Sequence, residues 1–131
     1  MSNTLEDNKA VARKFLEAMA TLDGATMGAL MASDFTVITK GTSVLSGTRT
    51  AAEMPALTER MIAKLPNPVK LEVLSVMAEG DRVACEAEGK ATTSDGKAYN
   101  NQYLMIFRIN AGKVHSVTEY MDTRLVDEVF G

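Results

Sequence analysis

Three short turns divide the second half of the chain, and they limit its possible folds more than any other feature. The turns are Glu79-Gly80-Asp81, Ser94-Asp95-Gly96-Lys97 and Asn110-Ala111-Gly112, and the runs between them are rich in β-branched and apolar residues. Glycine-containing turns of this length between such runs are typical of antiparallel hairpins. We therefore expect four strands that pair in chain order, over residues 69–78, 82–92, 99–109 and 113–121.

The first half of the chain is mainly helical in pattern. Apolar residues recur at helical spacing from Val11 to Leu22, Thr26 can cap a short second helix, and Thr50 with Glu53 matches a capping box. These signals predict helices over residues 4–22, 26–33 and 50–65, with one strand at 35–39. Helices segregated from an antiparallel sheet predict an α+β fold, here in one domain over residues 1–131. A long sheet with few helices can curl around them and enclose a cavity.

Charge and composition exclude several classes of partner. The net charge is −3 and no run of Lys or Arg forms a basic patch, so we expect no nucleic-acid and no membrane partner. The start MSNTLEDNKA has no apolar stretch and Cys85 has no second cysteine to pair with, which predicts a cytoplasmic protein without disulfides. One histidine and one cysteine do not make a transition-metal site, and no phosphate-binding glycine loop is present. We therefore expect no metal and no cofactor.

Strand alternation places an acidic residue on an apolar face. Between residues 99 and 109 the inward set contains Tyr99, Asn101, Tyr103, Met105 and Phe107, and in the last strand Val117, Glu119 and Met121 share a face with His115 at its start. A carboxylate there costs several kcal/mol unless it is hydrogen-bonded or neutralised. Pairing of the last two strands predicts that the Asn101 amide and the Tyr103 hydroxyl supply hydrogen bonds to Glu119.

Glu119 is the leading candidate for general acid/base catalysis, because burial would raise its pKa towards neutrality. The alternative is a carboxylate that Tyr and Asn hydrogen bonds hold in place to organise the sheet. Tyr103 could donate to a substrate carbonyl, or could instead be a core tyrosine bonded to Glu119. Asp122 is the second candidate acid, although it can also cap a helix over residues 123–130.

The remaining candidates would bind substrate. An apolar ligand is expected to contact a set of inward residues, namely Asn101, Phe15, Met19, Met105, Phe107, Val117 and Met121. Glu86 and Glu88 share one face of their strand and could face either the pocket or solvent. The small residues Val83, Cys85, Ala87 and Gly89 on the other face could pack against a second subunit, as could the outward Tyr120.

The segments AMATLDGATMGALMASDFTVIT and FRINAGKVHSVTEYMDT resemble the nuclear transport factor 2-like superfamily, and especially its SnoaL-like and ketosteroid-isomerase-related members. DGKAYNNQY and EYMDT are similar to small SnoaL-like bacterial proteins. The resemblance spans nearly the whole chain and implies a single SnoaL-like domain, in which a curved sheet wraps helices around a deep apolar pocket, usually as a homodimer. Proteins of this fold include isomerases, polyketide cyclases, epoxide hydrolases and pure binding modules, so the fold does not define a reaction.

The positions of known catalytic groups in similar proteins match this chain only in part. By the resemblance, Phe15, Thr39 and Met105 stand where a ketosteroid isomerase has its tyrosine, base and protonated acid, so that mechanism is excluded. Limonene-type epoxide hydrolases use two acids bridged by an arginine, and no Arg-x-Asp pair occurs within a predicted strand. SnoaL-like cyclases imply Asp122 or Glu119 as the acid, with help from His115.

Two functions remain open from the sequence. The first is a cofactor-independent isomerase, cyclase or hydrolase acting on a small apolar carbonyl or polycyclic compound by carboxylate acid/base chemistry. The second is a non-catalytic ligand-binding or accessory module in which the polar cluster is structural. Both predict a homodimer with a small apolar molecule in an internal pocket.

Overall fold

The computed structural model describes residues 4–131, so residues 1–3 of the expected domain lie outside the described residues. The described chain forms, in order, α1 (Thr4–Ala20), α2 (Gly24–Leu30), β1 (Met31–Thr39), β2 (Gly47–Thr50), the 3-10 helix η1 (Ala51–Glu53), α3 (Met54–Lys64), β3 (Lys70–Glu79), β4 (Arg82–Lys90), β5 (Gln102–Asn110), β6 (Lys113–Met121) and α4 (Thr123–Phe130). None of the helices within residues 4–131 combines the length and the apolarity that a bilayer crossing requires.

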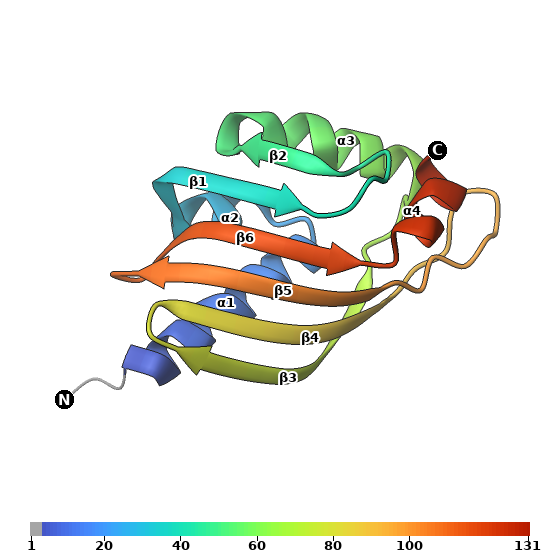
Figure 1. The fold of residues 1–131 in the computed structure, drawn as a ribbon. Coiled ribbons are helices and arrows are strands. Elements are labelled where there is room, and N and C mark those ends of the chain that lie inside the picture. Colours follow the sequence, from blue (N-terminus) through green and yellow to red (C-terminus); the bar gives the residue numbers. More distant parts are fainter. Residues whose placement is uncertain (1–3) are drawn as a thin grey trace.

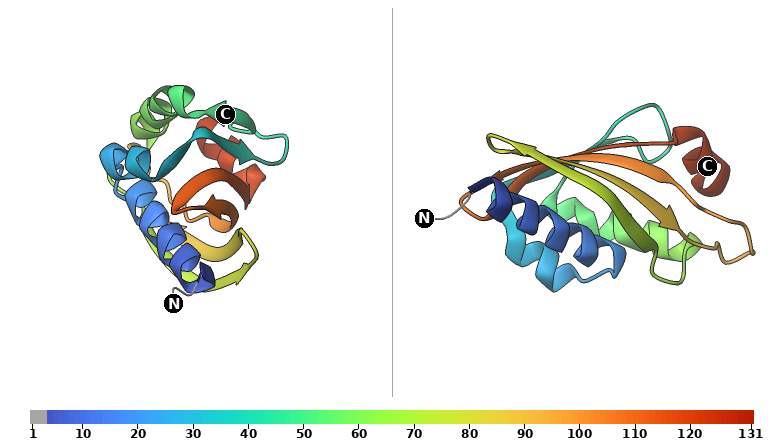
Figure 2. Two further views of the ribbon diagram at one scale, coloured as in Figure 1. Left: turned by 90° about the vertical axis from the view of Figure 1, so that its left-hand side faces the viewer. Right: turned by 90° about the horizontal axis from the view of Figure 1, so that it is seen from below.

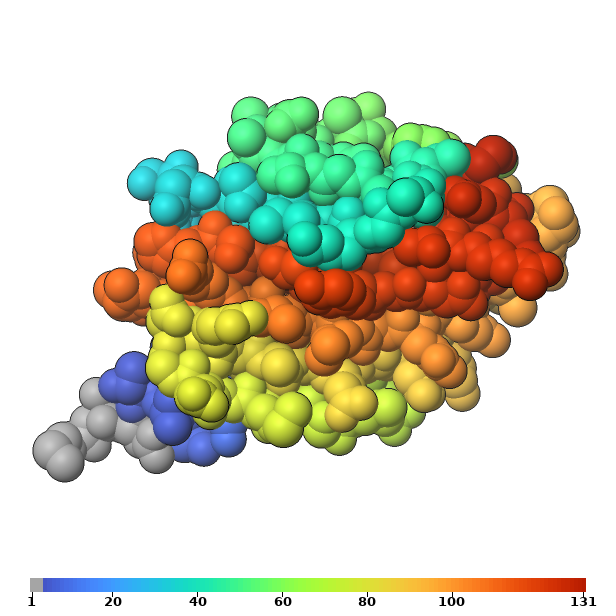
Figure 3. Space-filling model, viewed as in Figure 1, coloured from blue at the N-terminus to red at the C-terminus, as the bar shows by residue number. Residues whose placement is uncertain are grey.

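One curved sheet carries all six described strands in the order β2-β1-β6-β5-β4-β3 (Figure 1). Neighbouring strands are antiparallel except β1 and β6, which run parallel. Helices α1, α2 and α3 lie on the inner side of the sheet, and α4 lies at the end of β6 (Figure 2). Figure 3 shows the opposite, outer side, where β6, β5 and β4 run side by side. The expected α+β fold and the four-strand meander are confirmed.

The inner face of β5 follows the predicted alternation. Met105, Phe107 and Ile109 are buried, whereas Leu104 and Arg108 on the other face are exposed. The buried side chains pack against α1, where the Phe15 ring meets the Phe107 ring edge-on with centroids 5.9 Å apart. This core between α1 and the sheet gives the helix its fixed position beside β3, β4 and β5.

The small residues of β4 point inward, which corrects the expectation that they contact a second subunit. Val83 pairs with Phe107 and Cys85 with Met105, and all four side chains are buried in the same core. Burial raises the pKa of the Cys85 thiol to about 11. The acidic residues of this strand therefore lie on the outer face of the sheet.

β6 contains a bulge at His115, so His115 does not lie on the face of the strand that was predicted for it. Arg108 pairs with Ser116, whereas the next residue of β5 pairs with Val114, so His115 is an extra residue on β6. Val114 and Val117 are both fully buried as a result. The His115 Nδ1 atom lies 2.7 Å from the Asp34 Oδ1 atom, away from the core. The prediction that His115 shares the face of Val117 is wrong.

Other elements of the first half also differ from the expected ones. β2 was not predicted, because its residues Gly47–Thr50 carry no apolar alternation, yet it pairs with the end of β1. β1 begins at Met31, where a helix was expected to continue. The cap of α2 is Asp23, whose Oδ1 atom accepts the Thr26 N–H at 3.1 Å. The predicted capping box is present, since the Thr50 N–H donates to Glu53 Oε1 at 3.0 Å.

Candidate functional site

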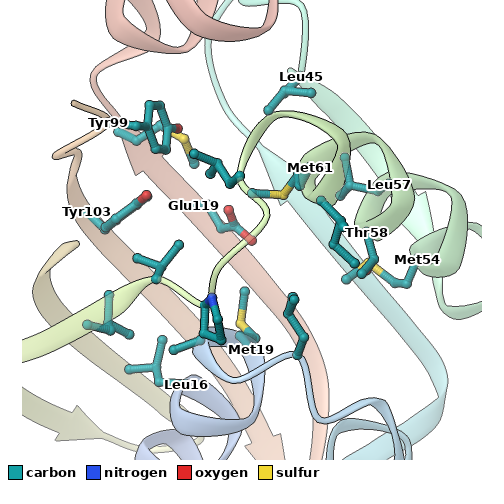
Figure 4. A pocket seen from close by; sticks show the side chains of 18 of the residues that line it. Leu16, Met19, Leu45, Met54, Leu57, Thr58, Met61, Tyr99, Tyr103 and Glu119 are labelled. Atoms are coloured by element: carbon teal, nitrogen blue, oxygen red, sulfur yellow. The ribbon is translucent and has the colours of Figure 1, made fainter. Parts of the chain in front are cut away.

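A cavity of about 150 Å³ lies between the inner face of the sheet, the end of α1 and the length of α3 (Figure 4). Its wall is almost entirely apolar. Six of the nine methionines of the chain line it, namely Met19, Met27, Met54, Met61, Met105 and Met121. Methionine side chains are flexible and polarisable, so this wall can adapt to apolar ligands of different shape.

Glu119 is the one charged side chain among the described residues that line the cavity. It stands in the middle of the sheet, paired with Thr39 on β1 and with Met105 on β5. The Lys40 N–H donates to its backbone carbonyl at 2.9 Å, which fixes the main chain at this point. The carboxylate points into the cavity, opposite the Leu57 and Met61 side chains of α3 (Figure 4).

The Glu119 carboxylate has no hydrogen-bond or ion-pair partner within residues 4–131, which corrects the expectation that Asn101 and Tyr103 bond to it. The side chain is half-buried, because part of its surface faces the cavity while protein surrounds it otherwise. Loss of hydration raises the pKa of Glu119 to about 7, against the opposing charge of Arg49. At neutral pH the carboxyl group therefore exists in both protonated and ionised forms.

Two tyrosine hydroxyls lie on the same side of the cavity as Glu119. Tyr103 and Tyr99 both line the cavity. Burial raises the pKa of both groups, and the nearby Glu119 carboxylate raises them further, so both remain protonated donors. The Tyr103 ring lies across β4 at Gly89, where an added Cβ would come within 3.2 Å of the ring. A glycine at that position allows the tyrosine to reach the cavity.

Asn101 has a structural role that explains its place at the start of a strand. Its Nδ2 atom donates to the Asp122 carbonyl at 3.2 Å, and its Oδ1 atom accepts the Asp122 N–H at 3.0 Å. Oδ1 also accepts the Gln102 N–H at 2.8 Å, and Nδ2 donates to the Tyr99 hydroxyl at 3.1 Å. The side-chain amide thus acts as a substitute peptide group that joins β5 to the end of β6. Asn101 is buried and does not line the cavity.

The structure places the other candidate residues in three locations. Met19, Met105 and Met121 line the cavity with Tyr103 and Glu119, as expected. Phe15, Phe107 and Val117 lie in the core beside the cavity and do not line it.

The remaining candidate acids lie outside the cavity. Asp122 caps α4, because its Oδ1 atom accepts the N–H groups of Arg124 and Leu125 at 3.1 and 3.2 Å. Glu86 is exposed on the outer face, where it accepts a hydrogen bond from the Ser75 hydroxyl at 2.6 Å. Glu88 lies on that same outer face of β4. None of the three can reach a ligand bound in the cavity.

Helix α3 also contributes to the cavity wall, which was not expected from the sequence. Its cavity-lining residues are Met54, Leu57, Thr58, Met61 and Ile62, all at helical spacing. Apolar residues recur at helical spacing in the sequence of α3, but the sequence does not show that they face a cavity. Within residues 4–131, no three His, Cys, Asp or Glu side chains are grouped in a way that could hold a metal ion.

Comparisons with known proteins place the chain among small α+β proteins. The sequence profile described as the SnoaL-like domain matches residues 12–117. Bal32a, from a soil-derived mobile gene cassette, is 23% identical, with a TM-score of 0.85 over 98% of this chain and 100% of its own. An NTF2-like protein of unknown function from Burkholderia pseudomallei is 18% identical, with a TM-score of 0.83 over 99% and 98%.

A provisionally assigned SnoaL-like polyketide cyclase from Jannaschia sp. CCS1 is 15% identical, with a TM-score of 0.80 over 99% of this chain and 95% of its own. Similarity at this level of identity establishes a shared fold only. No curated protein matches the sequence significantly.

Proposed function

The chain belongs to the SnoaL-like domain family, and we propose that it binds a small apolar molecule in its cavity and transfers a proton on that molecule through Glu119. The observation that carries this proposal is the position of the Glu119 carboxylate. It is the one charged group of the cavity wall within the described chain, and it has no hydrogen bond there that would give it a structural purpose.

The hydrogen bonds of Asn101 favour this proposal over a purely structural cluster. A structural cluster would use the carboxylate to hold the strands together, but Asn101 does so instead through the Asp122 backbone. An unpaired carboxylate in an apolar cavity lowers the stability of the fold. A group that is costly to the fold and faces the cavity is best explained by a role in chemistry on a ligand.

The geometry suits proton transfer next to a carbonyl group. Ionised Glu119 would take a proton from the carbon beside the carbonyl, the electron pair of that C–H bond would form a carbon–carbon double bond, and the π pair of the carbonyl would move onto its oxygen. The Tyr103 hydroxyl, near Glu119, would donate a hydrogen bond to the resulting enolate oxygen. Return of the proton to another carbon gives an isomer. Attack of the enolate carbon on a second carbonyl of the same molecule gives a ring, and the new alkoxide takes the proton back from Glu119. A pKa near 7 lets one carboxyl group serve both as base and as acid.

The test has two stages. A thermal-shift screen with steroids, aromatic polyketides, terpene epoxides and small enones first identifies a ligand, because a ligand at 100 times its Kd adds about 2.7 kcal/mol of stability. Exchange of the ligand's α-protons for deuterium in D₂O is then followed by NMR. We expect Glu119→Gln to slow this exchange by about 100-fold or more. Glu86→Gln, which changes an exposed glutamate on the outer face, is the matched control and should leave the exchange rate unchanged.

The second candidate function is a non-catalytic binding module. In that case a ligand would raise the melting temperature of the wild type and of Glu119→Gln alike, and no α-proton exchange would exceed the rate in buffer. Equal exchange by both proteins would also contradict the proposed role of Glu119.

We also propose that two copies pair through the outer face of the sheet. One row of outward residues crosses five strands and is largely apolar, consisting of Met77, Ala84, Ile106, Thr118 and Ile38. In the neighbouring row Leu104 pairs with Tyr120, and both are exposed. A partly exposed and largely apolar strip over the middle of a sheet supports an interface there.

A further inference from the structure

The edge strand β2 brings a basic residue to the inner side of the sheet, near Glu119. Arg49 is directly opposite Val37 on β1, and Val37 is buried in the core, so Arg49 also starts on the inner face. The neighbouring residues Thr48 and Thr50 are exposed, whereas Arg49 is half-buried. The row beside it runs from Gly47 through Thr39 to Glu119.

The strand pairing sets the separation between Arg49 and Glu119 across the sheet. They are two strands and two residues apart, which corresponds to about 12 Å between their Cα atoms. Both side chains are long and start on the same face of the sheet. Burial raises the pKa of Glu119, and the Arg49 charge lowers it by a smaller amount.

The Arg49 guanidinium is held in place outside the cavity. Its Nη1 atom donates to the Leu45 carbonyl at 2.7 Å, and the Leu45 side chain forms part of the cavity wall. Arg49 itself does not line the cavity. Hydrogen bonds from the Thr50 N–H and hydroxyl lower the pKa of Glu53, and the Arg49 charge adds to this effect.

The other elements around Glu119 bring no competing charge within the described chain. The lining residues of α1 (Leu16, Met19 and Ala20) and of α3 are uncharged, as are Asn67, Pro68 and Val69 in the connection to β3. Thr39 on β1 is uncharged, and Tyr99 and Tyr103 are protonated at neutral pH.

We infer that Arg49 is a positioning residue for the proposed site, because its guanidinium, tied to the Leu45 carbonyl behind the cavity wall, places a positive charge on the face of the sheet that carries Glu119 and favours the ionised carboxylate without touching the ligand. The importance of this effect for catalysis rests on the proposed function, but the effect itself is a property of the free protein. Removal of the arginine would lower the fraction of Glu119 that is ionised at neutral pH and can accept a proton.

The test is an NMR titration of the Glu119 side-chain carboxyl carbon in ¹³C-labelled protein, with its signal assigned by its loss in Glu119→Gln. We expect Arg49→Met, which keeps the length of the side chain but not the charge, to raise the titration midpoint by about one pH unit, a tenfold change in proton affinity. Arg49→Lys should restore most of the wild-type midpoint. If Arg49→Met does not fold, Arg49→Gln keeps a donor for the Leu45 carbonyl and provides the same comparison.

An unchanged midpoint in a folded variant without the charge would overturn the inference. A rise of the same size in Arg49→Lys would also contradict it, since loss of the guanidinium geometry would then be responsible. The pH profile of α-proton exchange separates this inference from the proposed function. A shifted midpoint without any exchange activity supports the role of Arg49 and refutes catalysis, whereas activity with an unshifted profile in Arg49→Met refutes the role of Arg49 alone.

Discussion

At the scale of single residues, Glu119 and Asn101 show how surroundings decide what a polar side chain does. Both are on the inner side of the sheet, close to the junction of β5 and β6. The Asn101 amide uses its donors and acceptor within the chain and gives the junction its geometry. The Glu119 carboxylate has no such bond among residues 4–131 and faces a cavity. Asn101 therefore stabilises the fold, whereas Glu119 in its ionised form lowers the stability of the fold.

The cost of ionised Glu119 should be visible as a pH dependence of stability. Its folded pKa of about 7 lies above the ordinary value of 4.5, so the folded state binds the proton more tightly than the unfolded chain. Stability is therefore highest below the unfolded pKa and falls as the pH rises from about 4.5 to 7. We expect wild type to lose about 2–3 kcal/mol relative to Glu119→Gln between pH 5 and pH 8. Urea unfolding of both proteins at each pH measures this difference, and a constant difference would contradict the raised pKa.

Asn101 should be a major determinant of stability, and its neighbour provides a control. Asn101→Ala leaves the Asp122 N–H and carbonyl at the end of β6 without their partner, which we expect to cost about 2–4 kcal/mol. Asn100 is exposed and accepts one long bond, from the Ala91 N–H at 3.4 Å, so Asn100→Ala should cost less than about 0.5 kcal/mol. Chemical denaturation measures both values. Equal effects of the two substitutions would show that the substitute peptide group does not stabilise the junction.

At the scale of secondary structure, the sequence predicted the elements whose two faces differ in polarity. It did not predict the elements that exist only because they pair with a neighbouring strand. The alternation in β5 identified its buried side chains, because one face of that strand is apolar and the other is not. β2 has no such contrast and is defined only by its pairing with β1. The bulge at His115 depends on the register between β5 and β6, which the sequence of one strand does not contain. Glu119 could be identified from the sequence because a charged residue on an apolar strand face is conspicuous. That its carboxylate has no hydrogen bond within residues 4–131 could be established only from the structure.

Helix α3 should respond to a ligand more than any other helix. No residue of α3 is fully buried, whereas α1 buries Ala12, Phe15 and Leu16. The apolar side of α3 faces the cavity, so a bound ligand would complete its packing. We expect the amides of α3 to exchange with D₂O faster than those of α1 in the free protein, and a saturating ligand from the screen to slow them severalfold. Protection that appears in α1 and not in α3 would place the ligand elsewhere.

At the scale of the whole molecule, the two faces of the sheet have different surroundings. The inner face and the helices enclose a cavity whose described lining comes from one chain. The outer face carries the exposed pair Leu104 and Tyr120, and no functional group of the proposed site points there. Glu119 nevertheless lies in the same strand as Tyr120, so contact with a second copy on the outer face would stiffen the strand that carries the carboxylate.

Pairing of two copies can therefore be separated from binding in the cavity. We expect the wild type to have about twice the 14.1 kDa mass of one chain by light scattering, and Tyr120→Lys to have the mass of one chain, because a charged ammonium group would have to be desolvated in the apolar interface. Val44→Lys changes a similarly exposed apolar residue in the loop before β2 and should leave the mass unchanged.

Since Tyr120 points away from the cavity, the single-chain variant should keep its ligand-induced rise in melting temperature and the titration midpoint of Glu119. A wild type that has the mass of one chain at every concentration would refute the pairing, and loss of ligand binding in the Tyr120→Lys monomer would mean that the cavity depends on the second copy.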